Sequence, residues 1–345
     1  MQTVARCRGY VVLIACLAFT AAILACGCRE VGEPAGQVEP PAEEPGPGPA
    51  LPEVTPPPGP LPEPPPLVLR WYPREICPGD YFVLQLENVS DDDVIRCTLD
   101  PEPEFFIRDG DHVALVPLSY WTAGESLIFR VAVERGDETI LDREVRVGVV
   151  GKEFATQHLY VTEEQSAMRS DDLWQQDWVH IERARAESHD EALWEGEFLM
   201  PVEGRISTEF GQIRYINDVP SGRHSGLDIA VPMGTPILAA NSGTVTLSMA
   251  LNVTGNTVII DHGLNLFSTY YHLDKLGVQA GEWVDRGDQI GTVGSTGFST
   301  GPHLHWTMGI GHTPIDPHLL VEEDPVGLFE FYADPEGAPG APVRR

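Results

Sequence analysis

Short apolar runs separated by turn-forming residues characterise the chain from about residue 67 to residue 150. Three of these runs, at 81–86, 112–117 and 127–133, are rich in β-branched and aromatic residues, and Asp/Gly clusters such as 108–111 lie between them. Runs of this length at regular spacing, bounded by turn signals, predict the strands of a small β-sandwich. We see no constellation of catalytic residues in it, so we expect an accessory or spacer domain over residues 67–150.

A change of pattern marks the next segment. Residues 163–194 are polar and acidic and contain neither Gly nor Pro, which predicts a connector over 151–199 that is helical at least in part. Trp174, Trp178 and Ile181 follow one another at i, i+4 and i+7, the spacing of one buried helix face. We expect this face to serve packing rather than function.

Glycines recur every few residues among apolar and β-branched residues from Met200 onward. This pattern predicts many short, tightly turned strands in a third folded region, over residues 200–322. The final stretch returns to Pro, Gly and acidic residues, so we expect a flexible tail over 323–345. The predicted fold class is therefore mainly β, with two β domains joined by a partly helical connector.

The N-terminal residues read as an export signal followed by a stalk. Arg6 and Arg8 precede an apolar run over 10–25 that ends in small residues, the features of a signal peptide over 1–26. A permanent transmembrane helix is the alternative, but the run is shorter than the roughly 20 residues that a span needs. Residues 27–66 are dominated by Pro, Glu and Gly, which predicts an extended linker.

The net negative charge of the chain argues against a nucleic-acid partner. The chain has 52 Asp and Glu against 22 Lys and Arg, a formal net charge of -30. Such a surface repels nucleic acid and anionic lipid headgroups and favours solubility. We therefore expect no nucleic-acid partner.

Six cysteines are present, and Cys7, Cys16 and Cys26 lie in the signal region. Because export permits disulfides, we expect a bridge between Cys77 and Cys97 in the first β domain, with two free thiols as the alternative. No cysteine follows Cys97. Any metal in the C-terminal domain must therefore be bound by nitrogen and oxygen.

Histidines and one aspartate in the C-terminal domain have the composition of a metal site. His224 precedes Asp228 by four residues, His272 follows much later, and His303 and His305 are two residues apart. A catalytic zinc ion keeps three protein ligands, which can be imidazole and carboxylate, and leaves a further position for water. Two histidines at i and i+2 of a strand project from the same face. The residues thus predict a site of two histidines and one aspartate, with the choice between His303 and His305 open.

The segment from Pro201 to about Leu320 resembles the lysostaphin/LytM-type zinc endopeptidases, which cut peptide cross-links of peptidoglycan. The resemblance covers about a third of the chain. The residues that carry it are, in chain order, Phe210-Gly211-Gln212-Ile213-Arg214, His224-Ser225-Gly226-Leu227-Asp228-Ile229-Ala230, Gly234-Thr235-Pro236-Ile237, Ala239-Ala240-Asn241-Ser242-Gly243-Thr244-Val245, Gly255-Asn256-Thr257-Val258, Tyr270-Tyr271-His272-Leu273, Gly294-Ser295-Thr296-Gly297 and Ser299-Thr300-Gly301-Pro302-His303-Leu304-His305.

This resemblance implies a fold and a set of roles. The fold would be an antiparallel β barrel-sandwich hybrid (duplicated hybrid motif), and one Zn²⁺ would be bound by His224, Asp228 and His305. His303 and His272 would flank the water that the metal activates, His303 as the proton carrier and His272 holding the nucleophile or stabilising the oxyanion. The implied substrate is the peptide stems of peptidoglycan. We expect His262, His312 and His318 to lie outside the site.

Two further similarities are looser. The β domain resembles the immunoglobulin-like module found ahead of some of these peptidases. The segment Ile23-Leu24-Ala25-Cys26 is similar to a bacterial lipobox, with Cys28 as a rival for the lipidated residue. The lipobox implies an exported protein that is lipid-anchored in the cell envelope, at its periplasmic or outer surface. Plain secretion is the alternative.

Three other functions are alternatives. The run 278–291 resembles hairpins of biotinyl and lipoyl carrier domains, for which Lys275 is the only lysine in the domain. A carrier has no use for His224, Asp228 and His305. A non-enzymatic module that has lost its metal ligands is the second, and a peptidase acting on a secreted protein is the third. Whether a direct D-alanine cross-link or a glycine-containing bridge would be cut stays open.

Overall fold

The computed structural model describes residues 65–108 and 110–325, all within one compact unit of the chain. The predicted signal peptide and lipobox, most of the linker and the C-terminal part of the tail lie outside the described residues. Within those two ranges, no helix combines the length and the apolar character needed to cross a membrane. Strands dominate the described part, as predicted.

The first domain consists of two four-stranded sheets. One has the order β1 (Val68–Tyr72), β3 (Tyr81–Glu87), β6 (Asp111–Pro117), β5 (Phe106–Arg108), and the other β2 (Glu75–Ile76), β8 (Glu138–Val149), β7 (Ser126–Arg135), β4 (Asp93–Cys97). Buried residues of both sheets, such as Leu84 and Val131, share one hydrophobic core. The strands predicted at 81–86, 112–117 and 127–133 are confirmed as β3, β6 and β7.

The expected disulfide is wrong. Cys77 and Cys97 are both free thiols. Cys77 follows β2 and Cys97 ends β4, and these strands are the two edges of the sheet, with β8 and β7 between them. Three strand spacings amount to roughly 14 Å. A disulfide requires Cα atoms less than about 7 Å apart, so the two thiols cannot meet.

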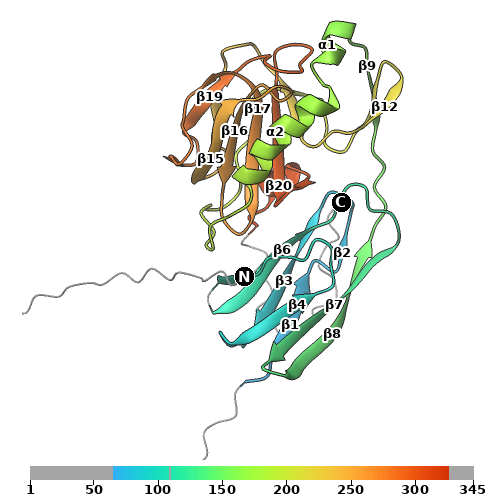
Figure 1. Cartoon of the computed structure of the whole chain (residues 1–345), viewed down its shortest axis with the longest axis vertical. Helices are drawn as coiled ribbons and strands as arrows, with labels where there is room; N and C mark the ends of the chain where they lie inside the picture. Colours follow the sequence, from blue (N-terminus) through green and yellow to red (C-terminus); the bar gives the residue numbers. More distant parts are fainter. Residues whose placement is uncertain (1–64, 109, 326–345) are drawn as a thin grey trace, which may run out of the picture. The chain divides into compact units, whose positions relative to one another are not determined.

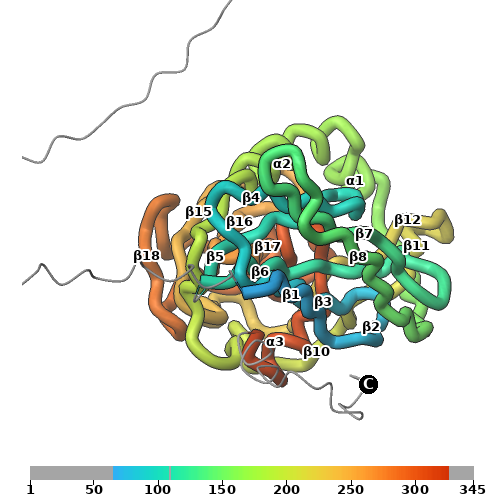
Figure 2. The backbone as a smooth tube through the Cα atoms, turned by 90° about the horizontal axis from the view of Figure 1, so that it is seen from below, coloured from blue at the N-terminus to red at the C-terminus, as the bar shows by residue number. Residues whose placement is uncertain are grey.

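The connector contains the predicted helical structure, α1 (Glu163–Ala167) and α2 (Asp171–Ala184), preceded by the short strand β9 (Thr156–Leu159). The side chain of Ser170 accepts a hydrogen bond from Leu173 N–H and caps the first turn of α2. Ile181 and Ala184 pack on apolar residues of the neighbouring sheet, and Figures 1 and 2 both show α2 beside β15 and β16.

The predicted buried face of this helix is partly wrong. Trp178 is 43% exposed, whereas Asp177 is completely buried. Asp177 therefore occupies the position on the buried face, next to Ile181, that was predicted for Trp178. Trp174 lines a groove instead of a packed interface. The i, i+4, i+7 spacing is real, but it starts at Asp177, because a buried carboxylate with hydrogen-bond partners can occupy a core-facing position that an apolar pattern does not reveal.

Most strands of the C-terminal region form one ten-stranded antiparallel sheet. Its main path is β10 (Arg205–Thr208), β13 (Leu227–Ala230), β20 (Leu304–Ile310), β17 (Leu266–Leu276), β16 (Asn256–Asp261), β15 (Gly243–Ala250), β18 (Trp283–Val284). Attached to it are β14 (Pro236–Leu238), β19 (Gln289–Val293) and β21 (Thr313–Ile315), and helix α3 (His318–Glu322) follows in sequence. β11 (Ile213–Ile216) pairs with β12 (Val219–Arg223) and, in parallel, with β9 of the connector.

Alternating side chains of the central strands form the core of this domain. Leu304, Trp306 and Met308 of β20 are fully buried in it, and the residues between them are free to take other roles. Lys275 lies within β17 and pairs with Thr292. It is not at a hairpin tip, where a carrier domain would need it.

Candidate metal centre

Strand register places the first two site residues opposite each other. β13 pairs with β20 so that Asp228 faces His305. Directly opposite residues of an antiparallel pair have Cβ atoms roughly 5 Å apart, close enough for both side chains to share one partner. Gly226 makes the approach of the strands possible, because a Cβ at this position would lie 2.1 Å from the carbonyl oxygen of Trp306.

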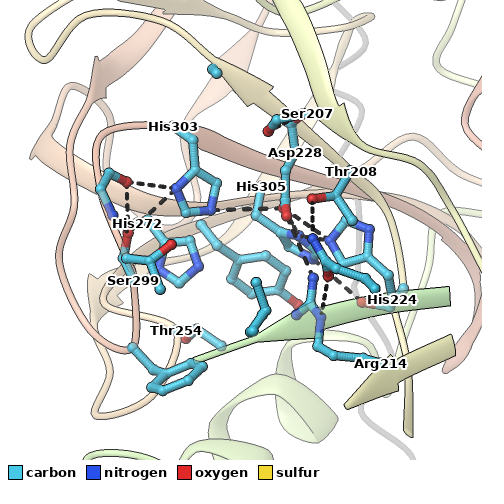
Figure 3. A pocket seen from close by; sticks show the side chains of 18 of the residues that line it. Ser207, Thr208, Arg214, His224, Asp228, Thr254, His272, Ser299, His303 and His305 are labelled. Atoms are coloured by element: carbon cyan, nitrogen blue, oxygen red, sulfur yellow. Dashed lines mark hydrogen bonds and ion pairs between the residues drawn. The ribbon is translucent and has the colours of Figure 1, made fainter. Parts of the chain in front are cut away.

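His224 completes a triangle of donor atoms. Its Nε2 lies 2.9 Å from Asp228 Oδ1 and 2.8 Å from His305 Nδ1, and the third side, from His305 Nδ1 to Asp228 Oδ1, is 2.7 Å. Figure 3 shows the three side chains converging. They form the group of potential metal ligands expected from the sequence, with ligand atoms within 4.8 Å of one another.

Hydrogen bonds to the outer ring nitrogens orient both imidazoles. His224 Nδ1 is 2.9 Å from the carbonyl oxygen of Glu209, which can only accept, so the proton of the neutral ring is on Nδ1. His305 Nε2 lies 3.1 Å from the hydroxyl of Thr307 and 3.3 Å from that of Ser225. With a proton on Nε2, His305 presents the lone pair of Nδ1 to the triangle.

The protonation states also suit a cation. Burial lowers the pKa of His305 to about 4, so the ring is neutral at pH 7. Burial by itself would raise the pKa of Asp228, but the facing imidazoles of His224 and His305 hold it well below its usual range. The imidazoles of His224 and His305 and one ionised carboxylate, aimed at a common point, match the nitrogen and oxygen ligands of Zn²⁺. The donor set fits that metal.

Two more histidines lie beside this triangle (Figure 3). His303 has its Nδ1 2.8 Å from the carbonyl oxygen of Gly301 and its Nε2 3.7 Å from Asp228 Oδ1. His272 has its Nδ1 2.8 Å from the carbonyl oxygen of Thr296. Each carbonyl fixes the proton on Nδ1 and leaves Nε2 as an acceptor. The two ring centroids are 4.9 Å apart.

His272 is held in an unusual backbone conformation. Its φ is 63°, in the left-handed region, and its N–H donates to the carbonyl oxygen of Thr254 at 3.0 Å. Burial, together with the charges of His303 and His305, lowers the pKa of His272 to about 3. The ring is therefore a neutral hydrogen-bond acceptor at physiological pH.

A groove of about 410 Å³ opens over these residues. Part of its lining comes from the connector, namely Gln157 and Leu159 of β9, Arg169 and Trp174. Arg214 of β11 donates from Nε to Gln157 Oε1 at 2.9 Å, and its Nη2 lies 3.5 Å from Asp228 Oδ2. The connector was predicted only to join domains. Its residues carry no motif, and only the pairing of β9 with β11 brings them to the site.

The remaining histidines of the domain lie elsewhere, as expected. His262 is buried, with Nδ1 2.7 Å from Ser242 O and Nε2 2.7 Å from Ser268 Oγ, and burial lowers its pKa to about 4. His318 Nε2 is 3.0 Å from a carboxylate oxygen of Glu209. The ring of His312 lies 5.5 Å from that of Trp178. None of the three lines the groove.

Comparison with known proteins places this site in a family. Residues 222–317 match the model of peptidase family M23. Peptidoglycan DD-endopeptidase ShyA of Vibrio cholerae is 40% identical over 120 residues, which are 34% of this chain and 28% of that protein. The DD-carboxypeptidase/endopeptidase Mpg of Neisseria meningitidis is 39% identical over 116 residues, 34% of this chain and 27% of Mpg. The aligned segment thus spans less than a third of these relatives.

A solved structure extends the likeness of fold beyond that segment. A protein of Pseudomonas aeruginosa assigned to peptidase M23 superposes with a TM-score of 0.50 and 25% sequence identity. The superposition covers 71% of this chain and 94% of the other. Residues 222–317, which contain all five site residues, are a domain of peptidase family M23.

Proposed function

We propose that this protein is a zinc-dependent endopeptidase that hydrolyses peptide cross-links of bacterial peptidoglycan. The observation that carries the proposal is the convergence of His224, Asp228 and His305, with ligand atoms within 4.8 Å of one another, beside two further histidines. The relative ShyA is named a peptidoglycan DD-endopeptidase and the relative Mpg a DD-carboxypeptidase/endopeptidase, and these names support the substrate class.

The metal would be held by His224 Nε2, Asp228 Oδ1 and His305 Nδ1, the three atoms of the triangle. Zinc bound there supplies the lowered pKa of a water molecule and the polarisation of the scissile carbonyl. The second oxygen of Asp228 faces Arg214, which fixes the orientation of the carboxylate.

His303 is the residue that moves the proton. Because Gly301 O fixes the proton on Nδ1, the free Nε2 can accept a proton from the attacking water and then deliver it to the leaving amine. The distance of 3.7 Å from Nε2 to Asp228 Oδ1 keeps His303 next to the ligand cluster without making it a member.

His272 acts on the nucleophile. Of the two roles that the resemblance allows, stabilising an oxyanion requires a donor, and the only proton of the neutral ring is bonded to Thr296 O. The low pKa of about 3 keeps a second proton off the ring. His272 Nε2 therefore accepts a hydrogen bond from the water. This bond orients the water so that a lone pair of its oxygen points at the carbonyl carbon.

We propose further that the chain is exported and lipid-anchored through Cys26, or through Cys28, with residues 27–66 as a stalk. The β domain over 67–150 is then an immunoglobulin-like spacer, 151–199 the connector, 200–322 a peptidase domain of the barrel-sandwich hybrid type and 323–345 a tail. The composition of the N-terminal segments supports the anchor and the stalk. The two stacked sheets support the spacer.

Hydrolysis of defined substrates tests the function. The zinc-loaded chain is incubated with cross-linked muropeptide dimers, with and without a chelator, and the masses of the products are measured by mass spectrometry. The proposal predicts two monomers whose masses sum to that of the dimer plus one water, and no reaction after chelation. Binding without cleavage would identify a non-enzymatic module, and cleavage restricted to secreted proteins would identify a different substrate.

A further inference from the structure

Positive charge is concentrated in the groove of an otherwise acidic chain. Arg169, Arg205, Arg214 and Arg223 line it, and Asp228 is the only carboxylate among the described residues of the lining. The chain as a whole has a net charge of -30. A cleft lined by one sign of charge attracts ligands of the opposite sign, even when the surface around it repels them.

Hydrogen bonds hold two of these arginines in place. Arg214 is oriented by Gln157, and its Nη2 is 3.5 Å from Asp228 Oδ2. Arg169, between α1 and α2, donates from Nη1 to the hydroxyl of Ser221 and from Nη2 to the carbonyl oxygen of Ser221 at 3.4 Å. Polar groups of Gln157 and Ser221 therefore hold the two guanidinium groups in place.

Hydrogen-bonding capacity remains on both side chains. A guanidinium has five N–H donors, and Nε of Arg169 and Nη1 of Arg214 have no hydrogen-bond partner among the described residues. In residues 65–108 and 110–325, no carboxylate lies within 4 Å of the Arg169 guanidinium. Asp228 is shared with the two imidazoles, so it cannot neutralise both arginines.

Burial adds to the demand for an anion. Both guanidinium groups are partly buried, and they lie close enough to repel each other. Both side chains nevertheless stay charged at neutral pH. Two partly desolvated like charges without a full set of counter-ions are an unfavourable arrangement, which a carboxylate bound between their free N–H groups would relieve.

We propose that Arg169 and Arg214 bind a free carboxylate of the substrate within one residue of the scissile amide. Arg214 contacts the same carboxylate, Asp228, that faces His224 and His305, so a group bound to it lies next to the reacting bond. This inference rests on the proposed function and names its substrate class. In a direct cross-link to a diamino dicarboxylic acid, the carbon attached to the scissile nitrogen carries a free carboxylate. A glycine bridge has only neutral amides there.

A matched pair of peptides tests this inference without the metal. One peptide contains the direct cross-link with its carboxylate free, and the other has that group converted to the primary carboxamide. Calorimetric titration of the metal-free full chain is expected to show the acid binding at least about tenfold more tightly than the amide, since hydrogen bonds to charged groups are the strong ones. The preference should weaken as salt is added.

Variants test whether Arg169 is responsible for the preference for the acid over the amide. Arg169→Gln should lose most of the discrimination while keeping the affinity for the amide, which also shows that the variant is folded. Arg183→Gln, an exposed arginine of α2 outside the groove, removes the same charge and should keep the full preference. Equal binding of acid and amide by the unmodified chain, or an unchanged preference in Arg169→Gln, would overturn the inference.

Hydrolysis by the zinc-loaded chain distinguishes failure of the arginine assignment from failure of the proposed function. A kcat/KM for the acid at least about tenfold above that for the amide supports the arginine assignment. Equal kcat/KM for both peptides would refute the arginine assignment and leave the peptidase in place. Hydrolysis of a glycine-bridged dimer but of neither peptide would refute the arginine assignment and leave the peptidase in place. Hydrolysis of none of the three would refute the peptidase, and the inference with it.

Discussion

His303 and His305 are two positions apart in the chain but have different hydrogen-bond partners. His305 lies in β20 opposite Asp228, and its Nδ1 is 2.7 Å from that carboxylate. His303 precedes the strand, and Gly301 O holds its Nδ1. The spacing of the pair could be recognised in the sequence but left ligand and base open. The family resemblance implied His305 as the ligand, and in the structure the atom that completes the triangle belongs to His305, while His303 Nε2 is 3.7 Å from Asp228 Oδ1.

The variant His303→Ala should therefore keep the metal and lose turnover. We expect kcat to fall by about a hundredfold or more, the usual loss when a general acid–base group is removed. Zinc content is measured by elemental analysis on the same sample as the activity. A variant with normal zinc and normal kcat would show that another group carries the proton.

Buried His262 should make stability fall in mild acid. Its folded-state pKa is lowered from 6.5 to about 4, so the unfolded chain binds the proton more readily, and stability is full above pH 6.5 and declines as the pH falls towards 4. The difference corresponds to about 3 kcal/mol of unfolding free energy. Urea unfolding of the chain and of His262→Gln between pH 4 and 7 measures it.

In His262→Gln this share of the pH dependence should disappear. His180→Gln, an exposed histidine of α2, serves as the control and should keep the slope of the parent chain. A slope that is the same in all three proteins would mean that His262 does not titrate as its burial implies.

At the scale of elements, strands and the connector helix could be predicted from periodicity, but the face of the helix could not. Apolar spacing identified Ile181 correctly and missed Asp177, whose carboxylate accepts hydrogen bonds from Asn252 N at 2.8 Å and Val253 N at 2.6 Å. The partners are more than seventy residues away in the chain. No local pattern reports such a contact.

Asp177 connects α2 to the site through one loop. Val253 and Thr254 line the groove, and the carbonyl oxygen of Thr254 accepts the N–H of His272. Asp177→Asn puts an amide N–H₂ against backbone donors, so we expect a loss of about 3 kcal/mol in unfolding free energy and a lower kcat. Thermal unfolding and kinetics on the same preparation provide both values.

Asp172→Asn is the matched control for this variant, because Asp172 lies in the exposed first turn of the same helix. Removing the carboxylate charge of Asp172 should lower the unfolding free energy by about 0.5 kcal/mol and leave kcat unchanged. If both variants behave alike, the loop does not depend on Asp177.

For the whole molecule, the sequence motifs led to the ligand cluster, and the strand register explains why. His224, Asp228 and His305 come from distant parts of the chain, and the pairing of β13 with β20 brings two of them together. The arginines that line the groove were not predicted, because they come from the connector and from β10, β11 and β12 and meet only in the folded chain. The expected disulfide failed for the same reason, since strand order is not visible in cysteine spacing.

The most direct measurement of the central claim is X-ray absorption at the zinc edge, recorded on the zinc-loaded chain and on His305→Ala. The account predicts one zinc per chain, with two imidazole nitrogens and otherwise oxygen at about 2.0–2.2 Å, and no stable zinc site in the variant. Sulfur in the coordination shell, fewer than two imidazoles, or an unchanged spectrum in His305→Ala would contradict it.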